Sequence, residues 1–253
     1  MQATLSSAGN ALSQIGGVGL FFVRILGAIK LSRRQHKETM RQVYFLGVRS
    51  LVIIMTCAFF VGMVLTLQGY TTLSRFGATD AVGTVLAMSL FRELGPVLTA
   101  LLFAGRAGTS VAAEIGLMKA TDQISAMDLM AVDPVERVIV PRFLAGFIAV
   151  PALTAIFNMV ALTGGSLLAS LFLGVDDGLF WSNIQHSVAF ANDYTSSFIK
   201  AAVFGGIVSL ISVYCGFVSE PTGEGMGRAT TQAVVYSSVL VLLFDFILTA
   251  FLF

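Results

Sequence analysis

Two adjacent residues of opposite charge, Arg92 and Glu93, stand inside the otherwise apolar stretch Ser89–Pro96. An ionised side chain at the centre of a bilayer costs at least about 2.5 kcal/mol on insertion scales, so both are expected to face the protein interior or a wet cavity. Neighbours on a helix point about 100° apart and cannot form a good pair with each other. Each of these two charges therefore needs a partner from elsewhere in the chain.

The charge-complementary candidates for that role are Lys200, at the mouth of the fourth apolar run, and Asp245 in the last one. Pro96 has no N–H, so the carbonyl of Arg92 loses its usual helical partner, and a kink is expected at this point. We therefore predict an intramembrane charge network of Arg92, Glu93, Lys200 and Asp245. The network is interpreted either as an internal staple between helices or as a functional site, and the two roles can coexist.

The motifs of the common enzyme classes are missing. The sequence has no GxxxxGK[ST] phosphate loop, no HExxH and no GxSxG elbow. Cys57 and Cys215 lie in apolar runs without metal-ligand spacing and are interpreted as buried thiols, while His36 and His186 have no clustered partners. We predict no catalytic residue, no metal site and no cofactor bound by this chain. A net charge of +1 gives no basic field for nucleic acid.

The composition indicates a membrane protein. Of the 253 residues, 56% are hydrophobic and 11% are charged, against about 25% charged in soluble domains. A helix needs about 20 apolar residues to cross the hydrocarbon core, and only a helix satisfies its own backbone there. Five runs qualify: Leu51–Tyr70, Ala81–Ala104, Phe143–Gly174, Phe198–Val218 and Ala233–Phe253. The predicted fold is all-α and polytopic, with about five transmembrane helices. The third run is long enough to tilt or break, at Pro151 or Gly164–Gly165.

Lysine and arginine gather on one side of these runs. Seven precede the first run, four lie in the connection from Gly105 to Arg142, and Arg228 follows the fourth run. The other side has Arg75 and the acidic loop Val175–Ser197, which contains Asp176, Asp177 and Asp193. Because basic loops stay in the cytosol, the N-terminus is predicted to be cytosolic and the C-terminus to lie outside.

The N-terminal region has apolar residues at helical spacing. Its positive charges follow the apolar stretch, whereas in a signal peptide they precede it. With Arg24 and Lys30 beside it, this pattern predicts a helix lying in the cytosolic interface; the alternative is a sixth, poorly apolar span. Residues 1–42 are assigned to this helix and a basic cytosolic segment, and residues 43–253 to the transmembrane domain. The apolar positions are Leu12, Ile15, Gly19, Phe22, Val23 and Leu26.

A short amphipathic helix is predicted over residues 119–133, in the connection between the second and third runs. Thr121 or Asp122 can cap it and Pro134 ends it. It is too short and too acidic to span, and methionine is an adaptable contact residue. The helix is interpreted either as a docking site for a soluble partner or as a cover for the protein's own cytosolic end. The candidate docking residues are Ile124, Met127, Leu129 and Met130.

A stripe of residues follows one face of the outer half of the first run and continues past its end. Its members are Leu65, Gly69, Thr72, Leu73 and Phe76. The stripe is interpreted either as ordinary lipid contact or packing, or as the wall of an apolar cavity open to the outer side. In the second interpretation Leu65, Thr72, Leu73 and Phe76 are candidate lipid-binding residues, together with Arg92 and Glu93.

The long central run Arg92–Met118, followed by Met130–Pro134 and Pro141–Phe143, closely resembles the MlaE (YrbE) permease family, the permease subunits of bacterial Mla phospholipid transporters. The resemblance extends from about Val43 to the C-terminus. The segment before Arg41 matches only in character. Further matching segments are Gly62-Met63, Leu67–Tyr70, Arg228–Thr231 and Asp245–Thr249.

This resemblance implies a non-catalytic subunit of an ABC transporter in the inner membrane of a Gram-negative bacterium. Such a permease moves phospholipid between the inner and outer membranes and maintains outer-membrane lipid asymmetry. The implied partners are a second copy of the chain, an MlaF-like ATPase that binds ATP and Mg, an MlaB-like STAS-domain protein and a periplasmic MlaD-like MCE ring.

Two other functions are kept as alternatives. The first is an ion-coupled secondary transporter that uses Arg92, Glu93 and Asp245 as a proton relay. Inverted repeats would favour it, and the sequence shows none. The second is a scaffold that only anchors an MCE ring.

Overall fold

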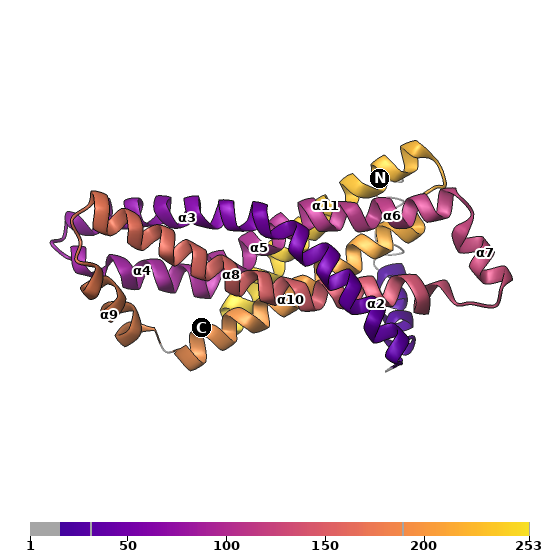
Figure 1. Cartoon of the computed structure of the whole chain (residues 1–253), viewed down its shortest axis with the longest axis horizontal. Coiled ribbons are helices and arrows are strands. Elements are labelled where there is room, and N and C mark those ends of the chain that lie inside the picture. Colours follow the sequence, from indigo (N-terminus) through magenta and orange to yellow (C-terminus); the bar gives the residue numbers. More distant parts are fainter. Residues whose placement is uncertain (1–15, 31, 189, 253) are drawn as a thin grey trace, which may run out of the picture.

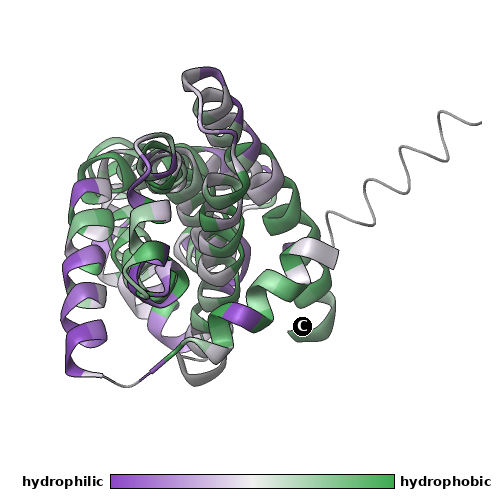
Figure 2. Cartoon of the chain, turned by 90° about the vertical axis from the view of Figure 1, so that its right-hand side faces the viewer, coloured by the Kyte–Doolittle hydropathy of each residue, from purple (hydrophilic) through white to green (hydrophobic). Residues whose placement is uncertain are grey.

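The computed structural model describes residues 16–30, 32–188 and 190–252, and within these ranges it consists of helices joined by short turns (Figure 1). Apolar residues dominate the long helices (Figure 2). Five helical segments are long and apolar enough to cross a membrane: Arg33–Ser74, Thr79–Ala120, Val135–Phe172, Asp193–Val218 and Gly223–Leu252. The predicted all-α fold with five membrane-spanning helices is confirmed.

The first long segment begins earlier than the sequence indicated. It comprises α2 (Arg33–Val43), one π-helical turn (Tyr44–Val48) and α3 (Arg49–Ser74) without a break. The basic residues of α2, which the sequence assigns to a cytosolic segment up to residue 42, therefore belong to a helix that continues into α3; their cytosolic position stays a prediction. Hydropathy alone missed this continuity because α2 is polar.

The second long segment also continues past its predicted end. A 3-10 turn (Thr79–Ala81) leads into α4 (Val82–Ser89), a π turn (Leu90–Leu94) and α5 (Gly95–Phe103). A second π turn (Ala104–Gly108) and α6 (Thr109–Ala120) complete a segment of 42 residues. The prediction that a connection starts at Gly105 is wrong for this stretch. Its small residues prolong the helix and let it pack closely, as at Ala112, whose carbonyl oxygen lies 2.8 Å from where a Cβ on Gly216 would be.

The third long segment is unbroken. A π turn (Val135–Ile139) opens α8 (Val140–Phe172), which runs through Pro151 and through Gly164–Gly165 as one helix. The two glycines do not break α8; they serve close packing against α3. A Cβ on Gly165 would lie 2.5 Å from Thr66 Oγ1, and one on Gly62 would overlap the Ala161 carbonyl oxygen. Small residues at this crossing bring the two backbones into contact.

The remaining elements complete a bundle around α10. A short helix, α9 (Asp177–Ser187), precedes α10 (Phe190–Val218), and α11 (Gly223–Leu252) follows. α10 packs against α5, α6, α8 and α11. Large buried side chains such as Phe103, Phe157 and Phe204 fill the core between these helices.

The described part of the N-terminal helix is Gly16–Gly27. Phe21 and Ile25 are buried, and the Phe21 ring contacts Tyr214 and Phe217 of α10 at 5.6 and 5.4 Å. Of the predicted apolar stripe, Val23 and Leu26 are exposed on the surface of the chain, Phe22 contacts Phe143 at 6.0 Å, and Leu12 and Ile15 lie outside the described residues. An interfacial position for this helix stays a prediction.

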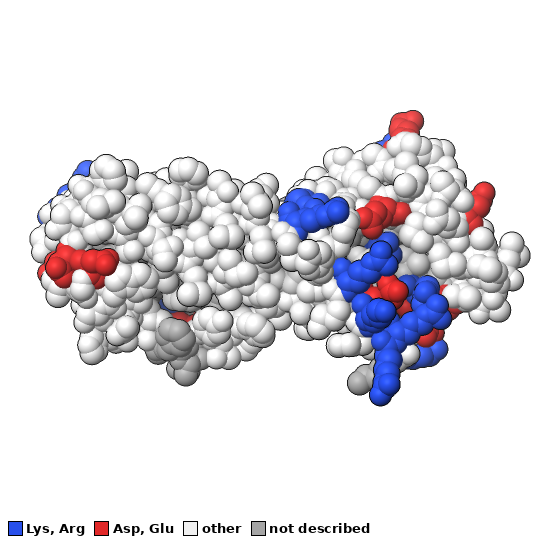
Figure 3. All heavy atoms as spheres, viewed as in Figure 1, with Lys and Arg blue, Asp and Glu red and all other residues white. Residues whose placement is uncertain are grey.

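The two ends of the bundle differ in charge. One end carries the start of α2 and the short helix α7 (Gln123–Leu129), and the other carries α9; they are called the α7 end and the α9 end (Figure 1). On the face seen in Figure 3, lysine and arginine gather toward the α7 end. Ion pairs from Lys30 to Glu136 at 2.6 Å and from Arg24 to Asp133 at 3.6 Å tie the N-terminal segment to this end.

Candidate functional site

A π-helical turn positions the central charges. Leu90–Leu94 forms this turn, and the N–H of Gly95 donates back to the Leu90 carbonyl. Pro96 follows immediately and has no N–H to offer. π turns within α-helices often mark functional sites, because the extra residue reorients the side chains around it. Here the turn holds Arg92 and Glu93 between α4 and α5.

Arg92 forms an ion pair with Asp193, which was predicted from the sequence to lie in a loop. Its Nε donates to Asp193 Oδ1 at 2.9 Å, and the Asp193 side chain is only 3% exposed, against 38% for Arg92. Beside this pair, the rings of Phe91 and Tyr194 make an edge contact at 6.3 Å. Asp193 belongs to α10 and not to an outer loop, which corrects the prediction for this residue.

Lys200 lies at the junction of three helical segments. Its side chain is fully buried, and not at the mouth of a helix as predicted. The ammonium donates to the Arg92 carbonyl at 2.6 Å, to Thr249 Oγ1 at 2.7 Å and to Asp245 Oδ1 at 3.3 Å. An ammonium has three donors, so these contacts match its capacity. The carbonyl that Pro96 was predicted to leave free is thus bound by Lys200.

Three of the four predicted members of the network, Arg92, Lys200 and Asp245, take part in ion pairs, but the pairs differ from those expected. Lys200 and Asp245 pair with each other, and Arg92 pairs with Asp193. Glu93 is exposed on the surface of this chain, and among the described residues it has neither an ion pair nor a side-chain hydrogen bond. The cluster thus has a buried part, formed by Asp193, Lys200 and Asp245, and an accessible part, formed by Arg92 and Glu93.

The sequence contained a signal for Asp193. Asp193, Ser197 and Lys200 stand at positions i, i+4 and i+7, which share one face of a helix. In the structure this face is buried, and the Ser197 hydroxyl lies 3.5 Å from the Asn158 amide nitrogen of α8. A Cβ on Gly95 would overlap Asn158 Oδ1, so only glycine fits there. The polar face was hidden because the helix was expected to begin five residues after Asp193, at Phe198.

This arrangement provides charges and hydrogen bonds inside and on the surface of a membrane-spanning segment. Among the described residues no group of three or more His, Cys, Asp or Glu side chains could hold a metal ion. The buried ion pairs link the π turn, α10 and α11. What the accessible part offers is a guanidinium and a carboxylate on the surface of a membrane-spanning segment, groups that can bind a polar head group or a second chain.

The predicted docking residues divide between two faces. Ile124 is buried and Met127 is half-buried against the core, so they stabilise the protein's own α7 end. Leu129 is 90% exposed and Met130 is 67% exposed at the end of α7. The amphipathic helix predicted over residues 119–133 would have placed these residues on one apolar face. The observed α7 is only seven residues long and ends at Leu129, so they do not share one face. Asp122 occupies the N-cap position, but its side chain makes no capping hydrogen bond.

The predicted lipid-binding stripe lies on α3 near the α9 end. Leu65 and Leu73 are half-buried, and Thr72 and Phe76 are exposed. The Thr72 hydroxyl donates to the Gln68 carbonyl at 2.9 Å within the helix. Phe76 lies just beyond the end of α3 and keeps its ring on the surface. The stripe thus follows an edge of the chain, and its lipid contact stays a prediction.

Comparison with known proteins places nearly the whole chain in one group. The family model described as permease MlaE matches residues 39–251. The chain is 47% identical to the intermembrane phospholipid transport system permease protein MlaE of Haemophilus influenzae, over 96% of this chain and 98% of that protein. It is 33% identical to a probable ABC transporter permease protein of Synechocystis, over 93% of each. It is 34% identical to the chloroplastic protein TRIGALACTOSYLDIACYLGLYCEROL 1 of Arabidopsis thaliana, over 86% of this chain and 62% of that protein.

Replacing Lys200 tests the buried part of the cluster. Lys200→Met should destabilise the protein by about 3–5 kcal/mol, because it leaves Asp245 as an uncompensated charge in a membrane-spanning helix. A Lys200→Met/Asp245→Leu double variant should recover part of this loss. The measurement is the melting temperature of the purified protein in detergent.

The matched control is Arg228→Met, which breaks the exposed pair with Glu224. Exposed pairs contribute little, so its melting temperature should stay close to that of the unmodified protein. A Lys200→Met protein as stable as this control would show that the buried network does not hold the bundle together.

Proposed function

Because the chain belongs to the MlaE permease family, we propose that it is the membrane-spanning subunit of an ABC transporter that moves phospholipid between the inner and outer membranes. The observation that carries the proposal is the match of residues 39–251 to the permease family model. The charge cluster supports a transport role, since it places two charged groups on the surface of a spanning segment without enzymatic machinery. In this role the chain maintains the lipid asymmetry of the outer membrane.

The proposed orientation puts the α7 end in the cytosol and the α9 end in the periplasm. The gathering of lysine and arginine toward the α7 end supports it (Figure 3). A separate ATPase subunit, which binds ATP and Mg, docks at the α7 end together with a STAS-domain protein. A ring of MCE-domain protein covers the α9 end, and a second copy of the chain completes the lipid path.

The exposed residues of α7 support the docking step. Leu129 and Met130 are large apolar side chains that project from the end of a short helix between two spanning segments. Burying apolar side chains on a partner is favourable, and methionine adapts to the surface it meets. We place the ATPase contact on these two residues. Ile124 and Met127 pack against the core and hold α7 in place.

The lipid path is proposed to run along the α3 stripe toward the accessible charges. Leu73 and Phe76 offer apolar contact to acyl chains at the α9 end. Arg92 and Glu93 lie in the π turn within the spanning segment Thr79–Ala120 and can bind a head group or close a gate. The buried pair of Lys200 and Asp245 keeps this turn in place during the cycle.

The first test is lipid transfer by the complete complex in reconstituted membranes. Transfer of labelled phospholipid should require ATP and should continue when an ionophore removes the ion gradient. Transfer that stops with the ionophore and proceeds without ATP would instead identify an ion-coupled transporter. A complex that assembles but transfers nothing under either condition would identify a scaffold for the MCE ring.

The carboxylate of Glu93 is expected to act in transport. Glu93→Gln should leave assembly unchanged, because the side chain is exposed and has no partner among the residues that the structure describes, while transport per assembled complex should fall about tenfold. The measurement combines the transfer rate with the basal ATPase rate. Glu224→Gln, on an exposed carboxylate outside the cluster, serves as the control. A Glu93→Gln complex with a normal transfer rate would leave this charge without a functional role.

The docking assignment is tested with a charge on the exposed part of α7. Leu129→Asp should abolish copurification of the ATPase while the permease is still inserted at normal yield, because the new carboxylate cannot be buried without a partner. Leu179→Asp makes the same change on an exposed leucine of α9, at the opposite end, and should copurify normally. Normal ATPase recovery with Leu129→Asp would rule out this contact.

The α3 stripe is tested by photo-crosslinking at two of its residues, Leu73 and Phe76, and at Val52 outside it, which is as exposed as Phe76. Phe76 is 79% exposed and Val52, on the α7 half of α3, is 77% exposed. If these positions only touch bulk lipid, crosslinkers at both should capture phospholipid alike. We expect stronger capture of acyl chains at Phe76 and at Leu73, measured by mass spectrometry of the labelled protein. Equal labelling at all three positions would reduce the stripe to ordinary bilayer contact.

A further inference from the structure

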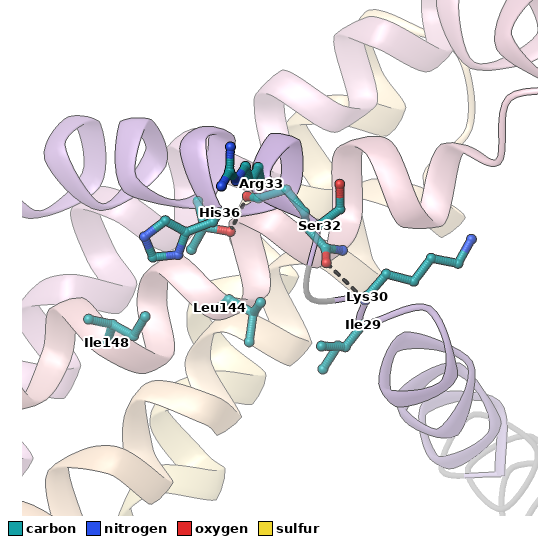
Figure 4. Close-up of a pocket in the computed structure, with 9 residues that line it drawn as sticks. Ile29, Lys30, Ser32, Arg33, His36, Leu144 and Ile148 are labelled. Atoms are coloured by element: carbon teal, nitrogen blue, oxygen red, sulfur yellow. Dashed lines mark hydrogen bonds between the residues drawn. The ribbon is translucent and has the colours of Figure 1, made fainter.

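A cleft of about 390 Å³ opens at the α7 end, between the segment that follows the N-terminal helix, the first turns of α2, and α8 (Figure 4). One wall is apolar and consists of Ile29, Leu144 and Ile148. The opposite wall carries Arg33 and His36 of α2. The cleft therefore joins a hydrocarbon-like surface to a cationic one within a single hollow.

Three other polar residues that line the cleft, Lys30, Gln35 and Thr39, already have partners. Gln35 accepts from the Lys30 backbone N–H at 2.9 Å and donates to the Ala28 carbonyl at 3.3 Å, and the Thr39 hydroxyl donates to the Gln35 carbonyl. The Lys30 ammonium donates to Glu136 at 2.6 Å, and this hydrogen bond raises the pKa of Lys30. These contacts fix the walls of the cleft and turn the Lys30 charge away from it, as Figure 4 shows.

Besides the Ser32 hydroxyl, which makes no capping hydrogen bond, Arg33 and His36 remain as the open polar groups of the cleft. Within the described part of the chain neither side chain has a hydrogen bond or an ion pair. The surroundings are cationic, since α2 contains four basic side chains and one acidic one, and its first turn contains no acidic residue. An anion in the cleft would meet a guanidinium without displacing any partner.

The apolar wall continues along an exposed apolar face of α8. Ile148 belongs to the spanning segment Val135–Phe172, and both it and Phe147 are exposed on α8. A soluble anion such as inorganic phosphate would use only the cationic wall. A phospholipid would use both walls, with its head group near the end of the bundle and its acyl chain along the spanning helix.

We propose that this cleft binds an anionic phospholipid of the leaflet at the α7 end, with its phosphate on Arg33 and His36 and an acyl chain along Leu144 and Ile148. The site lies at the opposite end of the chain from the stripe around Phe76, so its lipid is a resident ligand and not the transported one. Bound there, the lipid bridges α2 and α8 and holds the basic segment against the bundle.

The test measures lipid binding by the purified full-length chain in a nonionic detergent. Native mass spectrometry should detect phosphatidylglycerol bound in preference to phosphatidylcholine. Arg33→Gln should weaken phosphatidylglycerol binding about tenfold, because it removes the charged hydrogen-bond donors to the phosphate. Arg34→Gln is the matched control: it removes the same charge from the same helix at an exposed position that does not line the cleft, and should change binding less than threefold.

Three results would overturn the proposal. Equal losses in Arg33→Gln and Arg34→Gln would indicate attraction to the whole basic surface and not to the cleft. Displacement of the lipid by millimolar inorganic phosphate would indicate a site for a free anion. Loss of phosphatidylglycerol binding in Phe76→Ala would place the detected lipid on the transport stripe. Arg33 is exposed, so the melting temperature of Arg33→Gln without lipid should match that of the unmodified protein.

Discussion

The bilayer supplies no water to a buried charge, and the arrangement of this protein depends on how Lys200 meets that constraint. The ammonium is satisfied by a carbonyl of the π turn and by two side chains of α11, so one group joins three helical segments. A proline makes that carbonyl available, and a residue without an N–H thus creates a specific binding site for a cation. Apolar surface alone would not specify this crossing, because lipid is as apolar as the helices.

The charge cluster contains buried groups that stabilise the helix packing and exposed groups that other molecules can reach. Asp193 and Lys200 are buried, and the pairs they form hold the helices in register. Arg92 is partly exposed and Glu93 is exposed, although both are in the same π turn. This division lets the accessible charges change their contacts while the helical frame around them stays in place. The long unbroken helices provide the frame, and their close contacts at small residues keep it rigid.

Much of this structure could be predicted from the sequence, and the misses have physical causes. The number of spans and the fold class follow from hydropathy, because a run of about twenty apolar residues is long enough to cross the membrane and can do so only as a helix. The need for partners at Arg92 and Glu93 follows from the cost of charge in lipid, and the free Arg92 carbonyl follows from Pro96. Hydropathy could not show that helices continue through polar or small residues, so the continuity of α2 with α3 and of α6 with α5 was not predicted. For the same reason Asp193 was placed in a loop and not in α10. The ion pairs of the cluster could not be assigned from the sequence, because they depend on which helices become neighbours.

The second spanning segment has a mechanical consequence. Thr79–Ala120 is one continuous helical segment of 42 residues, with the charge cluster about a third of the way along it and α7 just beyond its end. At 1.5 Å per residue such a segment is about 60 Å long, and a tilt of about 5° displaces its far end by roughly 5 Å. A partner that pulls on α7 therefore works through a lever whose compliant joints are the two π turns. Force applied in the aqueous phase would reach Arg92 and Glu93 as movement of the helices between these joints, without any chain of intervening side-chain rearrangements.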